Sequence, residues 1–263
     1  MKFKTQFGIC TSFVHADLLA GHGYSFIEEA VKNLLIPHRS EGEFDELLDR
    51  ISHNRIPVRN CIGFLPDKLK SVGPIIHHDE ILEYADLVFG RAKKAKVEMI
   101  AFGSRGSRSI PEGFSKSEAE DQMVILCHDL GKLASKYHMM LVLEPFNRTE
   151  CNFINTLHEG AEIVKKVNHP NFQLMADIYH MMMEDESEEE LSEHAHLIKH
   201  IHVSEKQGRK PPGFSDGGYS TYIKKLIELN YAGNISIEAN WISLENQATK
   251  ALDSLESCCR LYW

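Results

Sequence analysis

The sequence has no long hydrophobic segment. None of the apolar runs in its 263 residues approaches the ~18 residues that a helix needs to span a bilayer, so we expect no association with membranes. The amino-terminal MKFKTQFGIC has two lysines but no apolar stretch of secretory length, which predicts that the chain is not exported. We therefore expect a cytoplasmic protein.

The sequence also lacks cysteine motifs and an excess of basic residues. Its six cysteines never form CxxC, which excludes zinc-ribbon and thioredoxin-type sites, and we expect buried thiols in a reducing compartment. Lys and Arg number 29 against 38 Asp and Glu, a formal net charge of −9. This balance predicts no sequence-independent binding to nucleic acid.

The chain does contain a regular alternation of short apolar runs and longer segments of helical period. The predicted strands are Phe7–Ser12, Tyr24–Glu28, Val58–Phe64, Val97–Gly103, Met140–Phe146, Gln173–Ile178, Ile198–Ser204 and Asn234–Ala239. Predicted helices between them include Ile81–Lys94, Lys116–Tyr137, Thr156–Val167 and Thr221–Leu229. Apolar strands that alternate with helices indicate a parallel sheet buried on both faces. Eight such units without a linker predict a single α/β domain over residues 1–263, a (β/α)8 TIM barrel.

Charged or imidazole side chains end the last four predicted strands. They are Glu144, Asp177, His202 and Glu238, at intervals of 33, 25 and 36 residues, each about one strand-and-helix unit. Because the carboxyl ends of barrel strands meet at one face, we expect these four side chains to converge. Three carboxylates and one imidazole carry a formal charge of −3 and are typical of a site for one divalent ion. Mn²⁺ is the expected metal, with Mg²⁺ and Co²⁺ as alternatives.

The motifs around these four residues resemble a known family. LEPFNRTE at 143–150, DIYH at 177–180, HIHVSE at 200–205 and IE at 237–238 resemble the xylose-isomerase-like barrels, and within them the ketose 3-epimerases (D-tagatose and D-psicose 3-epimerase) and related sugar isomerases. The resemblance runs from residue 7 almost to the carboxyl terminus. It implies a metal bound by Glu144, Asp177, His202 and Glu238, the same four residues that the strand spacing selects.

The resemblance also implies substrate contacts. Glu150 and His180 match family residues that line the O1–O3 end of the sugar. Arg209 matches a substrate-binding arginine if one residue is inserted after His202, which restores the Arg-x-x-Pro-Gly pattern at 209–213. A small-molecule sugar is thus the expected partner, and the family's habit of forming dimers or tetramers implies a homo-oligomer.

The expected reaction is epimerisation of a ketose at C3. The weakly acidic C3 proton would leave through an enediolate and return to the opposite face, with Glu144 and Glu238 exchanging the roles of base and acid. One alternative is an aldose–ketose isomerase of the hydroxypyruvate-isomerase type, which would use the same residues. A second is an apurinic-site endonuclease, but the net charge and the absence of further strand-end ligands on the first four predicted strands argue against it. A third is a sugar-binding barrel without turnover.

Two loops could be either simple connections or parts of the site. The segment Phe102–Arg108 is a βα loop whose arginines could reach the distal end of a substrate, and Pro211–Gly218 is either a simple connection or a cover over the mouth of the barrel. His200 lies two residues before His202, so the period of a strand predicts that it also points inward, one layer below the ligands.

Overall fold

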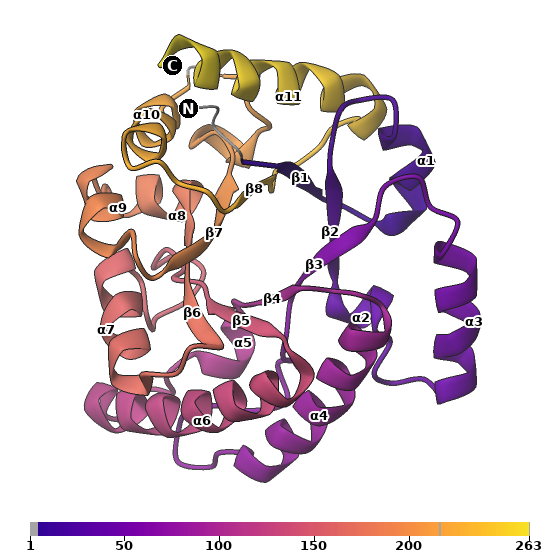
Figure 1. Cartoon of the computed structure of the whole chain (residues 1–263). Helices are drawn as coiled ribbons and strands as arrows, with labels where there is room; N and C mark the ends of the chain where they lie inside the picture. Colours follow the sequence, from indigo (N-terminus) through magenta and orange to yellow (C-terminus); the bar gives the residue numbers. More distant parts are fainter. Residues whose placement is uncertain (1–4, 216, 263) are drawn as a thin grey trace.

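Eight parallel strands close into a barrel in the computed structural model, which describes residues 5–215 and 217–262 (Figure 1). The strands pair in sequence order, and β8 pairs back to β1. They are β1 (Phe7–Cys10), β2 (Phe26–Ala30), β3 (Val58–Ile62), β4 (Met99–Phe102), β5 (Met140–Leu143), β6 (Phe172–Asp177), β7 (Ile198–Val203) and β8 (Asn234–Ile237). This confirms the predicted (β/α)8 architecture.

The helices form a ring outside the barrel (Figure 1). The longer ones are α3 (Glu41–Ile51), α4 (His78–Lys94), α6 (Lys116–Tyr137), α7 (Leu157–Val167), α10 (Ser220–Glu228) and α11 (Leu244–Leu261). Shorter helical segments are η1 (Phe13–His15), α1 (Ala16–Leu19), α2 (Val31–Leu34), α5 (Arg105–Arg108), α8 (Ile178–Met183), α9 (Glu189–His194) and η2 (Gln207–Arg209). All four predicted helices are present within a few residues of their expected bounds.

Two long helices fall outside the predicted segments. α3 begins with a capping box in which the Ser40 hydroxyl accepts from the Glu43 N–H and the Glu43 carboxylate accepts from the Ser40 N–H. α11 buries one face, which includes Ala248, Ala251, Leu252 and Leu255. Both carry the apolar period of a surface helix, so the sequence does contain the signal for them.

The barrel interior has two kinds of lining. Ala101, Val142 and Met175 form a small buried apolar cluster, separate from the large core between the strands and the helices. Because side chains alternate across a strand, Glu144 and Asp177 share the inward face of their strands with Val142 and Met175. The interior is therefore polar at the carboxyl ends of the strands, and the layer below combines these apolar side chains with the buried His200, which pairs with Met175.

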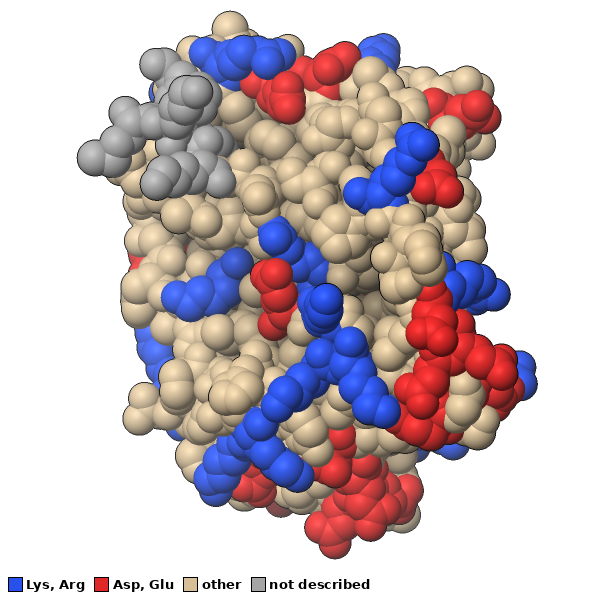
Figure 2. Space-filling view, turned by 45° about the vertical axis from the view of Figure 1, so that its right-hand side comes forward, with Lys and Arg blue, Asp and Glu red and all other residues tan. Residues whose placement is uncertain are grey.

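The exterior mixes charges of both signs. On the face shown in Figure 2, lysine and arginine side chains are interspersed with aspartate and glutamate. Among the described residues, no helix is both long and apolar enough to cross a membrane.

A partly buried carboxyl group ties the start of α7 to the segment that follows α8. The Oε1 atom of Glu186 accepts a hydrogen bond of 2.8 Å from the backbone N–H of Leu157. Burial raises the pKa of Glu186 to about 7. The folded protein therefore holds a proton on this group at pH values where an unfolded chain has lost it.

Replacement of Glu186 by Gln should remove one pH-dependent contribution to stability. A carboxyl group with a raised folded-state pKa stabilises the fold fully below its unfolded pKa of about 4.5, and this contribution disappears as the pH rises through about 7. We expect the free energy of unfolding of the wild type, relative to Glu186→Gln, to fall by about 1–2 kcal/mol between pH 5 and pH 8, with allowance for partial exposure. Urea titrations at both values measure it, with the exposed Glu193→Gln as control; a pH-independent difference would contradict the assignment.

Candidate functional site

The four predicted ligands lie together at the carboxyl ends of β5–β8. Glu144 follows β5, Asp177 ends β6, His202 lies near the end of β7 and Glu238 follows β8. One ligand atom from each lies within 4.8 Å of the others. Glu144, Asp177 and His202 are buried, whereas the Glu238 side chain is 24% exposed and so borders the opening of the site.

Two cationic side chains lie between these carboxylates. His202 Nδ1 is 2.8 Å from Glu238 Oε2 and 3.5 Å from Glu144 Oε1. The Arg209 Nη2 group donates to Asp177 Oδ2 at 2.6 Å and to Glu238 Oε2 at 2.5 Å. Without positive charge nearby, three carboxylates this close together would repel one another strongly.

The same contacts set the ionisation of the site. Burial alone would raise the pKa of Glu238, but the charges of His202 and Arg209 lower it to about 2. Burial would lower the pKa of His202, but Cys10, Glu28 and Glu238 raise it well above its usual value. Glu238 is therefore an ionised carboxylate at neutral pH, the form required of a proton acceptor or a cation ligand.

The donor set fits a divalent cation. Glu144 Oε1 is buried and makes no hydrogen bond to any other described residue. Buried polar atoms without partners are rare in folded proteins and call for a ligand. Three carboxylates and one imidazole at this spacing are typical of Mn²⁺, Mg²⁺ or Zn²⁺ sites.

The three predicted substrate residues lie beside this cluster. His180 Nδ1 accepts from Asn147 Nδ2 at 2.7 Å, and its Nε2 is 3.6 Å from Asp177 Oδ2. Glu150 Oε1 accepts from Asn147 Nδ2 at 3.2 Å, while Arg209 stacks over the Tyr179 ring at 4.7 Å. Gly208 and Arg209 have φ values of 70° and 51°, and the Arg209 guanidinium lies in the site, where it donates to Asp177 and Glu238.

One expectation about the first four strands is wrong. β2 contributes a buried acid to this region, because Glu28 Oε1 lies 3.3 Å from His202 Nε2. The sequence predicts a strand that stops at Glu28, whereas β2 continues to Ala30 and turns the Glu28 side chain into the barrel. His200 is fully buried one layer below His202, as the strand period predicts.

The structure gives contacts for both loops whose role the sequence left open, Phe102–Arg108 and Pro211–Gly218. Residues 105–108 of the first form α5, where Arg105 Nη1 donates to Glu150 Oε2 at 3.1 Å and the buried Arg108 lies over the Phe146 ring. In the second, the Gly213 N–H donates to Glu205 Oε1 at 2.8 Å. Asp216 of that loop lies outside the described residues.

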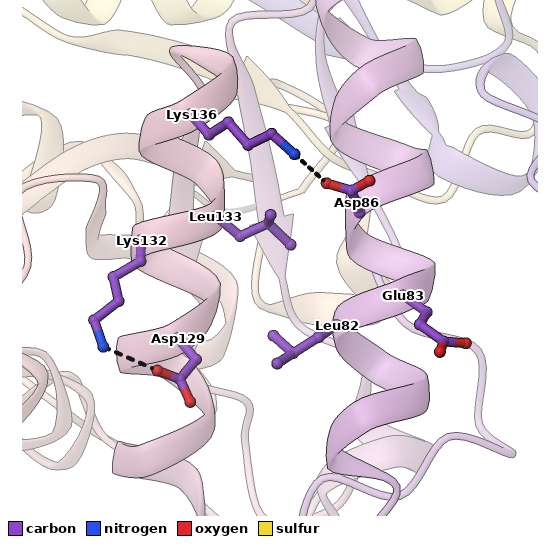
Figure 3. A pocket seen from close by; sticks show the side chains of 7 residues that line it. All are labelled: Leu82, Glu83, Asp86, Asp129, Lys132, Leu133 and Lys136. Carbon is purple, nitrogen blue, oxygen red and sulfur yellow. Dashed lines mark hydrogen bonds and ion pairs between the residues drawn. The ribbon is translucent and has the colours of Figure 1, made fainter.

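A separate surface cavity of about 690 Å³ lies between α4 and α6 (Figure 3). Its floor is formed by Leu82 and Leu133, and Lys136 pairs across it with Asp86 at 3.0 Å. It lies on the outer helical layer, and none of the residues that line it belongs to the strand-end cluster.

Comparison with known proteins agrees with the barrel and its motifs. The model of the xylose isomerase-like TIM barrel family matches residues 16–260. A D-psicose 3-epimerase of Ruminiclostridium cellulolyticum is 27% identical over 230 residues, which cover 85% of this chain and 76% of that protein. A 3-dehydro-D-guloside 4-epimerase of Escherichia coli is 28% identical over 48% of each chain.

Solved structures show the same fold. A D-psicose 3-epimerase from Clostridium cellulolyticum H10, solved with D-tagatose, superposes with a TM-score of 0.84 at 21% identity and covers 97% of this chain and 99% of its own. The IolI protein, solved with a bound zinc atom, superposes with a TM-score of 0.75 at 17% identity, covering 98% of this chain and 99% of its own. The resemblance seen in the motifs is thus confirmed at the level of family and fold.

Replacement of Gly103 by Ala should disturb the ligand on β5. A Cβ atom on Gly103 would lie 2.6 Å from Glu144 Oε2 and 2.6 Å from the Phe146 ring, too close for either group to stay in place. Overpacking of this kind costs about 1–3 kcal/mol, so we expect the affinity for Mn²⁺ to fall by roughly tenfold or more. Isothermal titration with Mn²⁺ measures it. Gly42→Ala, where a Cβ meets nothing within 4 Å, should bind Mn²⁺ as the wild type does; equal affinity of all three proteins would contradict the placement of Glu144.

Proposed function

We propose that this chain, which belongs to the xylose isomerase-like TIM barrel family, is a divalent-metal-dependent sugar epimerase that inverts C3 of a ketose. The observation that carries the proposal is the convergence of Glu144, Asp177, His202 and Glu238 at the carboxyl ends of four successive strands. Epimerases that act on ketoses are among the proteins most similar in sequence and in structure.

Glu144, Asp177, His202 and Glu238 would hold the metal ion, of which Mn²⁺ suits the donor set best, with Mg²⁺ and Co²⁺ as alternatives. When bound, a divalent ion supplies electrostatic stabilisation of the negative charge that develops on the substrate's carbonyl oxygen, worth several kcal/mol. The protein's own task is to remove a proton from C3 and return one to the other face.

Glu144 and Glu238 are placed to share that task. They follow β5 and β8, on two sides of a site that β6 and β7 complete between them. The low pKa of Glu238 keeps its carboxylate ionised, the form in which it could bind a cation or take up the C3 proton. Proton transfer by one carboxylate and return from the other gives inversion at C3, since the two act from opposite faces of an enediolate.

Glu150, His180 and Arg209 would orient the sugar. His180 Nε2 lies 3.6 Å from Asp177 Oδ2, Arg209 donates to the same oxygen, and Glu150 Oε1 lies 3.9 Å from Arg209 Nη1. Arg209 would also stabilise the negative charge of the enediolate. Arg105, paired with Glu150, extends this polar lining outward and would be the first contact for a phosphorylated or acidic substrate.

The proposed function also includes a partner, a compartment and an oligomeric state. Its partner would be a small-molecule sugar, with no nucleic acid or membrane involved. It would act in the cytoplasm, as a homo-oligomer of two or four chains.

Substitution of Glu238 by Gln tests the proton-transfer role. At saturating Mn²⁺ we expect the affinity for the ketose to change little, whereas exchange of the C3 hydrogen with solvent should fall by about 10²–10⁴-fold, because an amide cannot accept the proton. Incubation in D₂O followed by NMR measures this exchange, with the exposed Glu245→Gln as a matched control. Exchange at the wild-type rate in Glu238→Gln would overturn the assignment.

Removal of the metal tests the dependence on a cation. Dialysis against a chelator should abolish epimerisation, and addition of Mn²⁺ should restore it, since the carboxylate cluster needs a cation to bind the substrate oxygens. Metal content is measured alongside activity. Full turnover in protein shown to be metal-free would contradict the proposal.

An aldose–ketose isomerase is the second candidate. A hydroxypyruvate isomerase of Escherichia coli is 24% identical over 49% of this chain, and such an enzyme would move a proton between adjacent carbons with the same residues. Product analysis separates the two reactions. We expect a panel of free and phosphorylated ketoses to give C3 epimers, and conversion of hydroxypyruvate alone would favour the second candidate.

A further inference from the structure

A fully buried carboxylate lies beneath the candidate metal centre. Glu28 on β2 is 1% exposed, and its two oxygens contact two histidines of β7. Oε2 lies 2.8 Å from His200 Nε2, and Oε1 lies 3.3 Å from His202 Nε2. A carboxylate buried this deeply is costly to the fold unless both oxygens are paired, so its presence calls for a role.

The two strands are irregular at the residues that meet. The pairing of β2 with β3 shifts register between Ile27 and Glu28, and that of β6 with β7 shifts between Leu174 and Met175, where His200 is the next partner. Irregularities of this kind redirect side chains in barrels and often lie next to active sites. Here they lie at the two ends of the Glu28–His200 hydrogen bond.

The two nitrogens of His202 face different groups. Nε2 faces Glu28, and Cys10 Sγ is 3.8 Å from the same atom. Nδ1 faces the candidate metal ligands, 2.8 Å from Glu238 Oε2 and 3.5 Å from Glu144 Oε1. A proton held on Nε2 by the Glu28 carboxylate leaves the Nδ1 lone pair free for a cation.

We propose that Glu28 is the positioning residue of the metal centre: it anchors His202 through Nε2, selects the tautomer that presents Nδ1 to a divalent cation, and is itself fixed by His200. This inference rests on the proposed function, since it assumes a metal at the four-residue cluster. Glu28 touches neither the expected metal nor the sugar, and it acts on the metal through the His202 imidazole.

The neighbouring Glu29 offers a matched control. It is also buried and carries the same carboxyl group, but its side chain points to the opposite side of β2. There Oε2 accepts from the Phe13 N–H and Oε1 from Asn33 Nδ2, contacts that hold η1 and α2. Loss of its charge affects the outer layer, not His202.

The affinity for Mn²⁺ tests the proposal. In Glu28→Gln we expect the Kd for Mn²⁺, measured by isothermal titration, to rise about 10–100-fold, as is typical when the partner of a metal-bound histidine is removed. Activity at saturating Mn²⁺ should return to near the wild-type value, because Glu28 takes no part in proton transfer. Glu29→Gln should lower the melting temperature but keep the wild-type Kd.

A second measurement needs no variant. In the wild-type protein loaded with diamagnetic Zn²⁺, long-range ¹H–¹⁵N spectra should show a protonated Nε2 and an unprotonated Nδ1 for His202. The opposite tautomer, or a wild-type Kd in Glu28→Gln, would overturn the role of Glu28 and leave the metal site standing. A wild-type protein that binds neither Mn²⁺ nor Zn²⁺ at this cluster would instead refute the proposed function.

Discussion

Repulsion between carboxylates at the mouth of the barrel is the constraint on which the rest of the site depends. Glu144, Asp177 and Glu238 meet within 4.8 Å, in surroundings with little water to screen their charges. His202 and Arg209 reduce this repulsion, because their nitrogens lie 2.5–2.8 Å from oxygens of Asp177 and Glu238. When His202 is neutral, as a metal ligand must be, Arg209 alone leaves two negative charges of the three acids unbalanced, and one divalent cation would balance them.

The scaffold makes this concentration of charge tolerable. Each acid stands at the end of an apolar strand whose other residues pack in the core, so the strands are fixed independently of the charges at their tips. Below the cluster lie the apolar side chains of Val142 and Met175 and the buried Glu28–His200 pair.

Much of this could be predicted from the sequence, because parallel barrels repeat. Period and spacing located all eight strands and selected the four residues that converge. Glu28 was missed although it ends its predicted strand, because a Glu-Glu pair gives no sign of which member faces inward. Only the pairing with β7, 172 residues away in the sequence, makes that distinction. Arg209 was found only by allowing one inserted residue, which the turn at Gly208 accommodates.

The paired glutamates of β2 also bear on how the barrel closes. Adjacent residues of a strand face opposite ways, so a slip of one position would leave Glu29 inside and Glu28 among the outer helices. A slipped register would leave a negative charge among apolar groups. It would also remove the hydrogen bonds by which Glu29 holds η1 and α2. Hydrophobic packing alone discriminates weakly between such neighbouring alignments when both faces are apolar. Two adjacent acids with different partners therefore make the shifted register of β2 less stable than the native one.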